Sequence, residues 1–178
     1  MARPLRLTAQ VSAVGLVAAL LALLIWRVAQ SDKGVSQALL DGEQPTAPTF
    51  DLKRLDGEGR IDLASIRGKT PIVLDFWASW CVPCIHESRR LEAARKQYGD
   101  RVEFIGVDTK DVSSDARAWQ RRHGITYPSV HDGSGNELTK WGGLPIPKIF
   151  FVNRSGKVVG ELQAEEDLPR YLRQITSS

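Results

Sequence analysis

The two cysteines of the chain, Cys81 and Cys84, are the residues best suited to chemistry, and only two residues separate them. They follow an apolar run over residues 71–74, which predicts a buried strand, and they precede a helical pattern. The first turn of a helix has unpaired N–H groups and partial positive charge, so a thiolate there is stabilised. We expect Cys81 to be the exposed nucleophile and Cys84 to be the resolving thiol that closes an internal disulfide. Pro83 suits a first helical turn, where a missing N–H costs nothing.

A C-x-x-C pair has other uses, and the rest of the sequence weighs against most of them. Zinc would require further ligands, and the chain offers only His86, His123 and His131 with no second C-x-x-C. Haem attachment needs a histidine directly after the second cysteine, where this chain has Ile85. A structural disulfide across so short a loop would add little stability. We therefore favour redox exchange, with no metal and no cofactor other than the Cys81–Cys84 disulfide.

The segment VLDFWASWCVPC, residues 73–84, resembles the active-site segment of the thioredoxin superfamily. Residues 45–172 are similar to the membrane-tethered, extracytoplasmic TlpA/ResA/CcmG (DsbE) branch of that superfamily. The resemblance implies an α/β protein with the thioredoxin fold, in which helices flank a mixed central sheet. It also implies an N-terminal β-hairpin extension, an N-terminal transmembrane helix and thiol:disulfide oxidoreductase activity.

The order of the expected elements agrees with this fold. Alternating strands and helices predict parallel pairing with right-handed crossovers, and a tight turn near the C-terminus predicts an antiparallel hairpin. The expected elements are a hairpin around 56–59, strands at 71–74 and 102–107, helices at 82–98 and 113–123, an extended piece at 127–130, a short helix at 137–141, strands at 148–152 and 158–162, and a helix at 166–175.

Ile146 and Pro147 open a segment that resembles the family strand headed by a cis-proline opposite the active site. Because proline cannot donate to a sheet, the preceding Ile146 backbone stays free to pair with a substrate strand. Pro145 is the competing position, but its offset from the following strand fits less well. We assign substrate binding to Ile146 and Pro147, together with Trp80 and Pro83 beside the cysteines.

Two acids are further catalytic candidates. Asp75 lies six residues before Cys81, where thioredoxin has a buried acid, and a raised pKa would let it take the proton of Cys84 through a water. Many members of the TlpA branch have asparagine there, and a strand-end residue bonded to backbone is the alternative. Glu87, one helical turn after Cys84, matches the acid that tunes the thiol pair in this branch. Its alternative is a solvated helix face with Arg90 as ion-pair partner.

Residues 7–26 contain no charge and as a helix would span about 30 Å, the thickness of a bilayer core. Arg3 and Arg6 precede this segment and favour a cytoplasmic N-terminus, with the rest of the chain outside. A cleaved signal peptide is the alternative, but residues 27–29 supply only one of the two small residues that cleavage requires. The predicted organisation is a membrane anchor over 1–30, a linker over 31–48 and a thioredoxin-like domain over 49–178.

The net charge of +3 and the pI near 9.0 raise the question of nucleic-acid binding. The first 33 residues hold four basic residues and one acidic residue, so they account for the whole excess and the remainder is neutral. Nucleic-acid binding therefore has no support from charge.

The predicted function is reduction of disulfides in extracytoplasmic protein substrates. The resemblance implies apocytochrome c as a candidate substrate, a membrane-embedded electron donor and a catalytic domain on the periplasmic side of the membrane. Two alternatives stay open. One is a disulfide-forming oxidant, since direction depends on the reduction potential, and the other is a copper-binding chaperone that uses the two cysteines as soft ligands.

Overall fold

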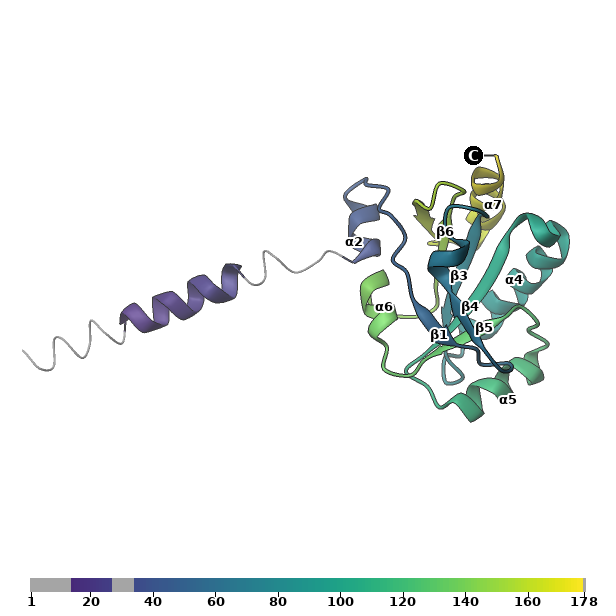
Figure 1. The fold of residues 1–178 in the computed structure, drawn as a ribbon, viewed down its shortest axis with the longest axis horizontal. Coiled ribbons are helices and arrows are strands. Elements are labelled where there is room, and N and C mark those ends of the chain that lie inside the picture. The colour runs from purple at the N-terminus through teal and green to yellow at the C-terminus, as the bar shows by residue number, and fades with distance from the viewer. Residues whose placement is uncertain (1–13, 27–33, 178) are drawn as a thin grey trace, which may run out of the picture. The chain divides into compact units, whose positions relative to one another are not determined.

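The computed structural model describes residues 14–26 and 34–177, and the chain divides into two units, Met1–Asp32 and Lys33–Ser178. In the first unit the described residues form a helix over 14–26, and residues 7–13 of the expected membrane span lie outside the described part. Within residues 14–26 and 34–177, no helix combines the length and apolar character needed to cross a bilayer. The second unit holds all the other described elements (Figure 1).

A mixed sheet forms the centre of the second unit. Its strands are β3 (Ile72–Trp77), β4 (Glu103–Thr109), β5 (Ser129–Asp132), β6 (Lys148–Val152) and β7 (Val158–Glu161). The strand order is β5-β4-β3-β6-β7, with β3, β4 and β5 parallel and β6 antiparallel to both β3 and β7. Every residue of β3 is buried, as expected for a continuous apolar strand covered on both faces.

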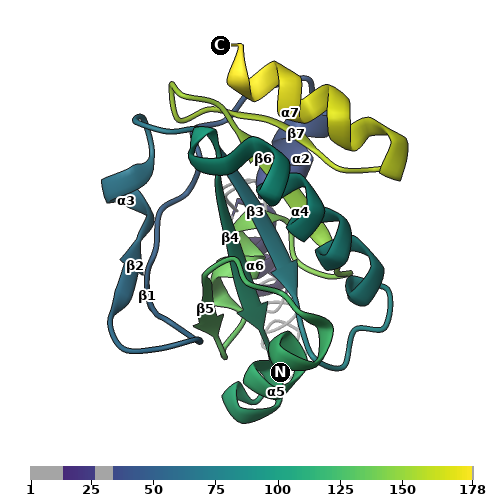
Figure 2. The ribbon, with the colours of Figure 1, turned by 90° about the vertical axis from the view of Figure 1, so that its right-hand side faces the viewer.

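Helices cover both faces of this sheet (Figure 2). They are α4 (Cys84–Tyr98), α5 (Ser113–His123), α6 (Asn136–Trp141) and α7 (Leu168–Thr176). Successive strand residues point to opposite faces. Trp77 of β3 stacks on Trp119 of α5, with ring centroids 4.4 Å apart, whereas its neighbour Phe76 contacts Trp141 of α6 on the other face. The predicted thioredoxin-like architecture, a mixed sheet flanked by helices, is confirmed.

The expected hairpin precedes the sheet in the chain. It consists of β1 (Asp51–Lys53) and β2 (Arg60–Asp62), which pair antiparallel and lead into the short helix α3 (Leu63–Ile66). The hairpin reaches the outer strand β5 through an isolated bridge between Arg54 and Val130. It therefore packs beside the central sheet as a separate two-stranded sheet.

Residues 35–48 of the segment expected to be a linker, residues 31–48, are a packed part of the second unit. Helix α2 (Val35–Leu40) buries Val35 and Ala38, and Ala47 is fully buried. This differs from the expectation because two apolar residues three positions apart suffice to seat a short helix against a formed surface. Such a pattern is too short to be recognised from hydrophobic periodicity.

Gly106 in β4 has no space for a side chain. A Cβ there would lie 2.2 Å from Oγ of Ser129 and 2.7 Å from Nε1 of Trp77. We predict that Gly106→Ala lowers the free energy of unfolding by about 1–3 kcal/mol, the usual cost of overpacking a core, as measured by urea denaturation. Gly57→Ala is the matched control, because a Cβ there meets no atom within 4 Å. Equal stability of the two variants would refute the steric argument.

Candidate active site

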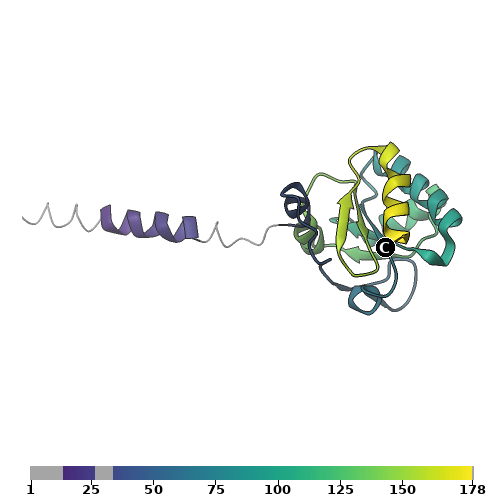
Figure 3. The same cartoon turned by 90° about the horizontal axis from the view of Figure 1, so that it is seen from above.

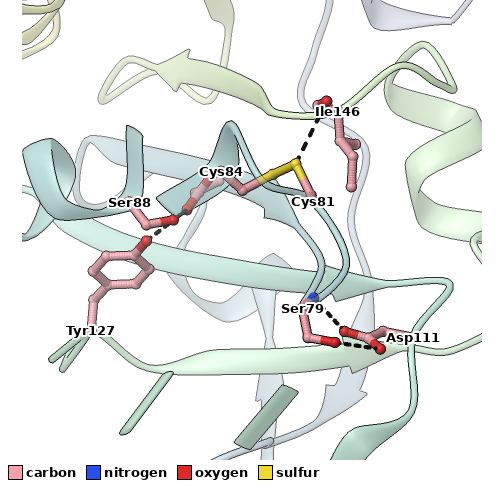
Figure 4. Close-up of a disulfide and its surroundings, with 8 residues drawn as sticks. Ser79, Cys81, Cys84, Ser88, Asp111, Tyr127 and Ile146 are labelled. Carbon is pink, nitrogen blue, oxygen red and sulfur yellow. Dashed lines mark hydrogen bonds between the residues drawn. A yellow bond between two sulfur atoms is a disulfide. The ribbon is translucent and has the colours of Figure 1, made fainter. Parts of the chain in front are cut away.

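Cys81 and Cys84 form a disulfide, with an S–S distance of 2.04 Å and a Cα–Cα distance of 5.4 Å (Figure 4). It lies where the chain passes from the end of β3 to α4, which begins at Cys84. The helix starts two residues later than predicted, because Val82 and Pro83 form the turn before it. Cys81 therefore lies directly before this turn, and Cys84 is the first helical residue.

The two cysteines differ less in accessibility than expected. Cys81 is 4 % exposed and Cys84 is fully buried. The expectation of an exposed Cys81 is wrong for this disulfide-bonded form, because the loop before β6 lies against it. The Ile146 carbonyl oxygen is 3.8 Å from Cys81 Sγ. Cys81 remains the outer of the two residues.

Pro147 stands at the head of β6, as the resemblance implied. The Ile146–Pro147 peptide bond is cis, and so is the Leu144–Pro145 bond. The next residue, Lys148, pairs with Phe76 near the end of β3. This pairing brings the Ile146 carbonyl to the disulfide (Figure 4).

Asp75 is a buried carboxyl in the interior of β3. Its Oδ2 accepts hydrogen bonds from the Tyr127 hydroxyl at 2.6 Å and the Ser88 hydroxyl at 3.0 Å, whereas its Oδ1 has no donor among the described residues. Burial raises the pKa of Asp75 to about 6, although the two hydroxyl donors act in the opposite direction. Ser88 lies one turn after Cys84 on α4, so Asp75 is tied to the helix that carries the buried cysteine. Both donors are side chains, whereas the alternative suggested by the sequence was a strand-end residue bonded to backbone groups.

Glu87 is half-buried on α4, and burial raises its pKa, with the neighbouring Glu165 carboxylate adding to the rise. Arg90, the partner suggested by the sequence, forms its ion pair with Glu165 instead. His86, Glu87 and Glu165 have potential ligand atoms within 4.8 Å of one another and are the one such grouping among the described residues. Within this grouping, Glu165 is already paired with the Arg90 guanidinium, which neutralises its charge.

Two contacts that the sequence did not predict hold the turn before Cys81. The Asp111 carboxylate accepts hydrogen bonds from the Ser79 N–H at 2.5 Å and the Ser79 hydroxyl at 3.0 Å. The Trp80 indole N–H donates to the Lys110 carbonyl at 3.1 Å. Lys110 and Asp111 directly follow β4, and the carboxyl ends of neighbouring parallel strands meet at one edge of a sheet. This rule could have identified Lys110 and Asp111 as neighbours of the cysteines from the sequence.

Large apolar side chains are exposed on three loops that meet near this end of the sheet. They are Trp80 at 53 %, Val82 at 76 %, Val112 at 60 % and Leu144 at 54 % exposure. Within residues 34–177, Leu40 is the one other large apolar residue exposed to this degree. Exposed apolar groups of this kind are typical of an interaction surface. Pro83, also assigned to substrate binding, is exposed beside Val82.

A thioredoxin-like fold that carries a C-x-x-C disulfide at a strand-to-helix junction defines a thiol-disulfide oxidoreductase. Residues 44–160 match the model of the AhpC/TSA family, and the chain belongs to this family.

Known relatives and solved structures agree with this assignment. The thiol-disulfide oxidoreductase ResA of Bacillus thuringiensis subsp. konkukian is 30 % identical over 134 residues, which cover 73 % of this chain and 76 % of that protein. This relative confirms the resemblance to the TlpA/ResA/CcmG branch.

Two solved structures share the fold. A DsbF homologue from Corynebacterium diphtheriae superposes with a TM-score of 0.65 at 25 % identity, over 75 % of this chain and 88 % of that one. A thiol:disulfide interchange protein from Chlorobium tepidum gives 0.65 at 24 % identity, over 75 % and 97 %.

We predict that the stability of the disulfide form falls as pH rises through the titration of Asp75. Its pKa is about 6 in the fold against an ordinary value of 3.8, so the folded state holds this proton more tightly than the unfolded state. The contribution is complete below pH 3.8 and is lost as pH rises to the folded pKa and above. Asp75 should lower the free energy of unfolding by up to about 3 kcal/mol over this range, and Asp75→Asn should remove this part of the pH dependence. The buried Asp108, whose pKa is raised to about 9, contributes a slope of the same sign that the variant keeps.

Urea unfolding at a series of pH values measures the effect. Asp62→Asn, which alters an exposed acid at the start of α3, is the control and should keep the wild-type slope. A slope in Asp75→Asn equal to that of the wild type would show that Asp75 does not hold the proton.

Proposed function

We propose that this oxidoreductase acts as a reductant of disulfides in extracytoplasmic protein substrates, with apocytochrome c as the favoured substrate. The observation that carries the proposal is the Cys81–Cys84 disulfide facing the Ile146 carbonyl at the head of β6. A thiol pair in that position can meet a polypeptide aligned along the strand start. The resemblance to the TlpA/ResA/CcmG branch supports the substrate class.

The reaction begins with the reduced chain. The Cys81 thiolate attacks one sulfur of a substrate disulfide, which forms a mixed disulfide and releases the first substrate thiolate. Cys84 then attacks the Cys81 sulfur, re-forms the internal disulfide and releases the second thiolate. Two electrons pass to the substrate, and two protons from the cysteine pair balance the two new thiols. No cofactor beyond the cysteine pair is required.

Substrate docking is assigned to the groups around the outer sulfur. A peptide would align beside Pro147 and pair with the Ile146 backbone, in the manner of a strand added to a sheet. The exposed Trp80 ring and the exposed Pro83 would contact the residues that flank the substrate cysteine. The exposed Leu144 extends the same apolar surface.

Two acids are assigned to the chemistry of the thiols. Asp75 would receive the proton of Cys84 during the resolving step, because its Oδ1 has no donor among the described residues and its pKa of about 6 leaves it ionised at neutral pH. Glu87, half-buried one turn after Cys84, would tune the thiol pair through its charge.

The proposed location is a cell membrane, with the N-terminus cytoplasmic and the catalytic domain outside. The uncharged run over residues 7–26 and the arginines before it support this orientation. Outside the cytoplasm a reductant must be resupplied with electrons, so we include a membrane-embedded electron donor in the proposal.

We predict that Cys84→Ser accumulates a covalent complex with a protein disulfide substrate, because the mixed disulfide on Cys81 can no longer be resolved. Non-reducing electrophoresis of the reduced full chain mixed with insulin measures it. Cys81→Ser is the matched control and should trap little, since its remaining thiol is fully buried in the fold. Absence of a trapped complex, under conditions in which the wild type reduces insulin, would refute the assigned order of attack.

Equilibration of the wild-type chain with glutathione measures the reduction potential of the cysteine pair, which sets the direction of electron transfer. A reductant should have a potential below about −260 mV, the lower limit of the cytosolic glutathione poise by extraction. A clearly higher potential would favour the oxidant alternative.

We predict that Asp75→Asn slows release of the second substrate thiol by at least about tenfold, because proton transfer to a placed base contributes substantially to such steps. In the wild type this rate should fall as pH drops below 6, where Asp75 is protonated. The variant should be slow at every pH. Stopped-flow measurement after mixed-disulfide formation gives the rate, with Asp62→Asn as control. An unchanged rate in Asp75→Asn would remove it from the mechanism.

A further inference from the structure

Helix α2 lies against the segment that leads from α6 to β6. Figures 1 and 3 both show α2 beside α6. A Cβ at Gly34, the residue before α2, would lie 3.1 Å from the Cα of Gly142, and a Cβ at Gly142 would lie 2.1 Å from Oγ of Ser36. Gly142 also has a φ of +128°, which side chains disfavour. Glycine at 142 leaves the space that the Ser36 side chain occupies, and glycine at 34 allows the two backbones to approach closely.

The Ser36 hydroxyl joins the two ends of the loop over residues 142–147. It donates to the carbonyl oxygen of Trp141, the last residue of α6, at 2.9 Å. It also accepts from Nζ of Lys148, the first residue of β6, at 3.2 Å. One hydroxyl has one proton to donate and lone pairs to accept, so both contacts form at once. A single side chain therefore spans the base of the loop that carries Ile146 and Pro147.

Lys148 is a rigid anchor for this contact. Its ammonium group pairs with Glu161 of β7 at 2.6 Å, and both side chains are nearly buried, at 11 % and 12 % exposure. A buried pair with a further hydrogen bond is strongly held, because releasing either group would leave a buried charge unpaired. Removal of the Ser36 hydroxyl leaves this ion pair in place and breaks the link between Trp141 at the end of α6 and Lys148 at the start of β6.

The loop itself presents the carbonyl of Ile146 to the disulfide, 3.8 Å from Cys81 Sγ. A shift at either end of this loop would therefore move the Ile146 carbonyl relative to Cys81. Two of its residues are glycines, Gly142 and Gly143, with φ angles of 128° and 70°. Glycine allows the backbone more conformations than other residues do, so this loop benefits from additional contacts that hold it. The contacts of Ser36 with Trp141 and Lys148 restrain both ends of this loop.

We propose that Ser36 is a positioning residue for docking of protein substrates, because it fixes the loop that presents the Ile146 backbone to them. The inference rests on the proposed function, in which a substrate strand pairs with Ile146. A polypeptide needs the loop in register with the sulfurs, whereas a small disulfide needs only access to Cys81. Loss of the Ser36 hydroxyl should therefore weaken reaction with proteins and spare reaction with small disulfides.

The test compares the reduced full chain with its Ser36→Ala and Ser65→Ala variants. Ser65 is the matched control because its hydroxyl makes one local hydrogen bond, to the Asp62 carbonyl in the turn before it. Ser36→Ala removes the hydrogen bonds to Trp141 and Lys148. We expect it to raise the apparent KM for insulin disulfide by about three- to tenfold, the range that the net free energy of a hydrogen bond corresponds to. Its rate with dithiobis(nitrobenzoate) should match that of the wild type. Equal KM values for insulin, or equal losses with both disulfides, would overturn the proposal.

Amide hydrogen exchange separates this inference from the proposed function. The Gly142 and Gly143 amides donate to the carbonyl oxygens of Thr139 and Leu138. In Ser36→Ala these two amides should exchange at least about fivefold faster than in Ser65→Ala, since local opening becomes easier. Unchanged exchange would overturn the positioning role even if activity changed. If the wild type did not reduce insulin at all, the proposed function would fall, and the exchange result would still decide whether Ser36 restrains the loop.

Discussion

The antiparallel pairing of β3 with β6 is the constraint on which the site depends. It sets Phe76 opposite Lys148, so the end of β3 that leads to the cysteines lies beside the start of β6 that follows Pro147. Cys81 and Ile146 are 65 residues apart in the chain, and sheet register brings them together. A shift of one residue would also turn each side chain of β3 to the opposite face and remove Asp75 from its partners.

Strand β3 also contains a buried carboxyl, Asp75, whose desolvation lowers the stability of the fold. An ionisable carboxyl in the interior of a central strand is unfavourable, and Asp75 retains only two hydroxyl donors, Tyr127 and Ser88. An apolar residue there would be expected to pack without that cost. In the proposed mechanism this carboxyl is the base for the buried thiol, and the rest of the core offsets the cost of its desolvation.

Local signals made part of this structure predictable. The cysteine spacing, the apolar run before it and the proline heading a strand are each encoded within a few residues, so the fold and the meeting of the two segments followed from sequence and resemblance. The contacts of Asp75 with Tyr127, 52 residues away, and of Ser36 with Trp141, 105 residues away, were not predictable. They depend on which side chains face each other once the sheet is assembled. The burial of Cys81 escaped prediction for the same reason.

The stretch from residue 45 to residue 55 has a consequence for solubility. Thr46 bridges Lys157 next to β7, and Arg54 bridges Val130 of β5, so one continuous piece of chain covers part of each outer strand. Bare outer strands recruit other extended chains and seed aggregation. Under the proposed function, the substrates would dock as extended chains beside β6, which neighbours the outer strand β7. The two bridges leave less of the outer strands free to pair with another extended chain, which lowers the tendency to aggregate.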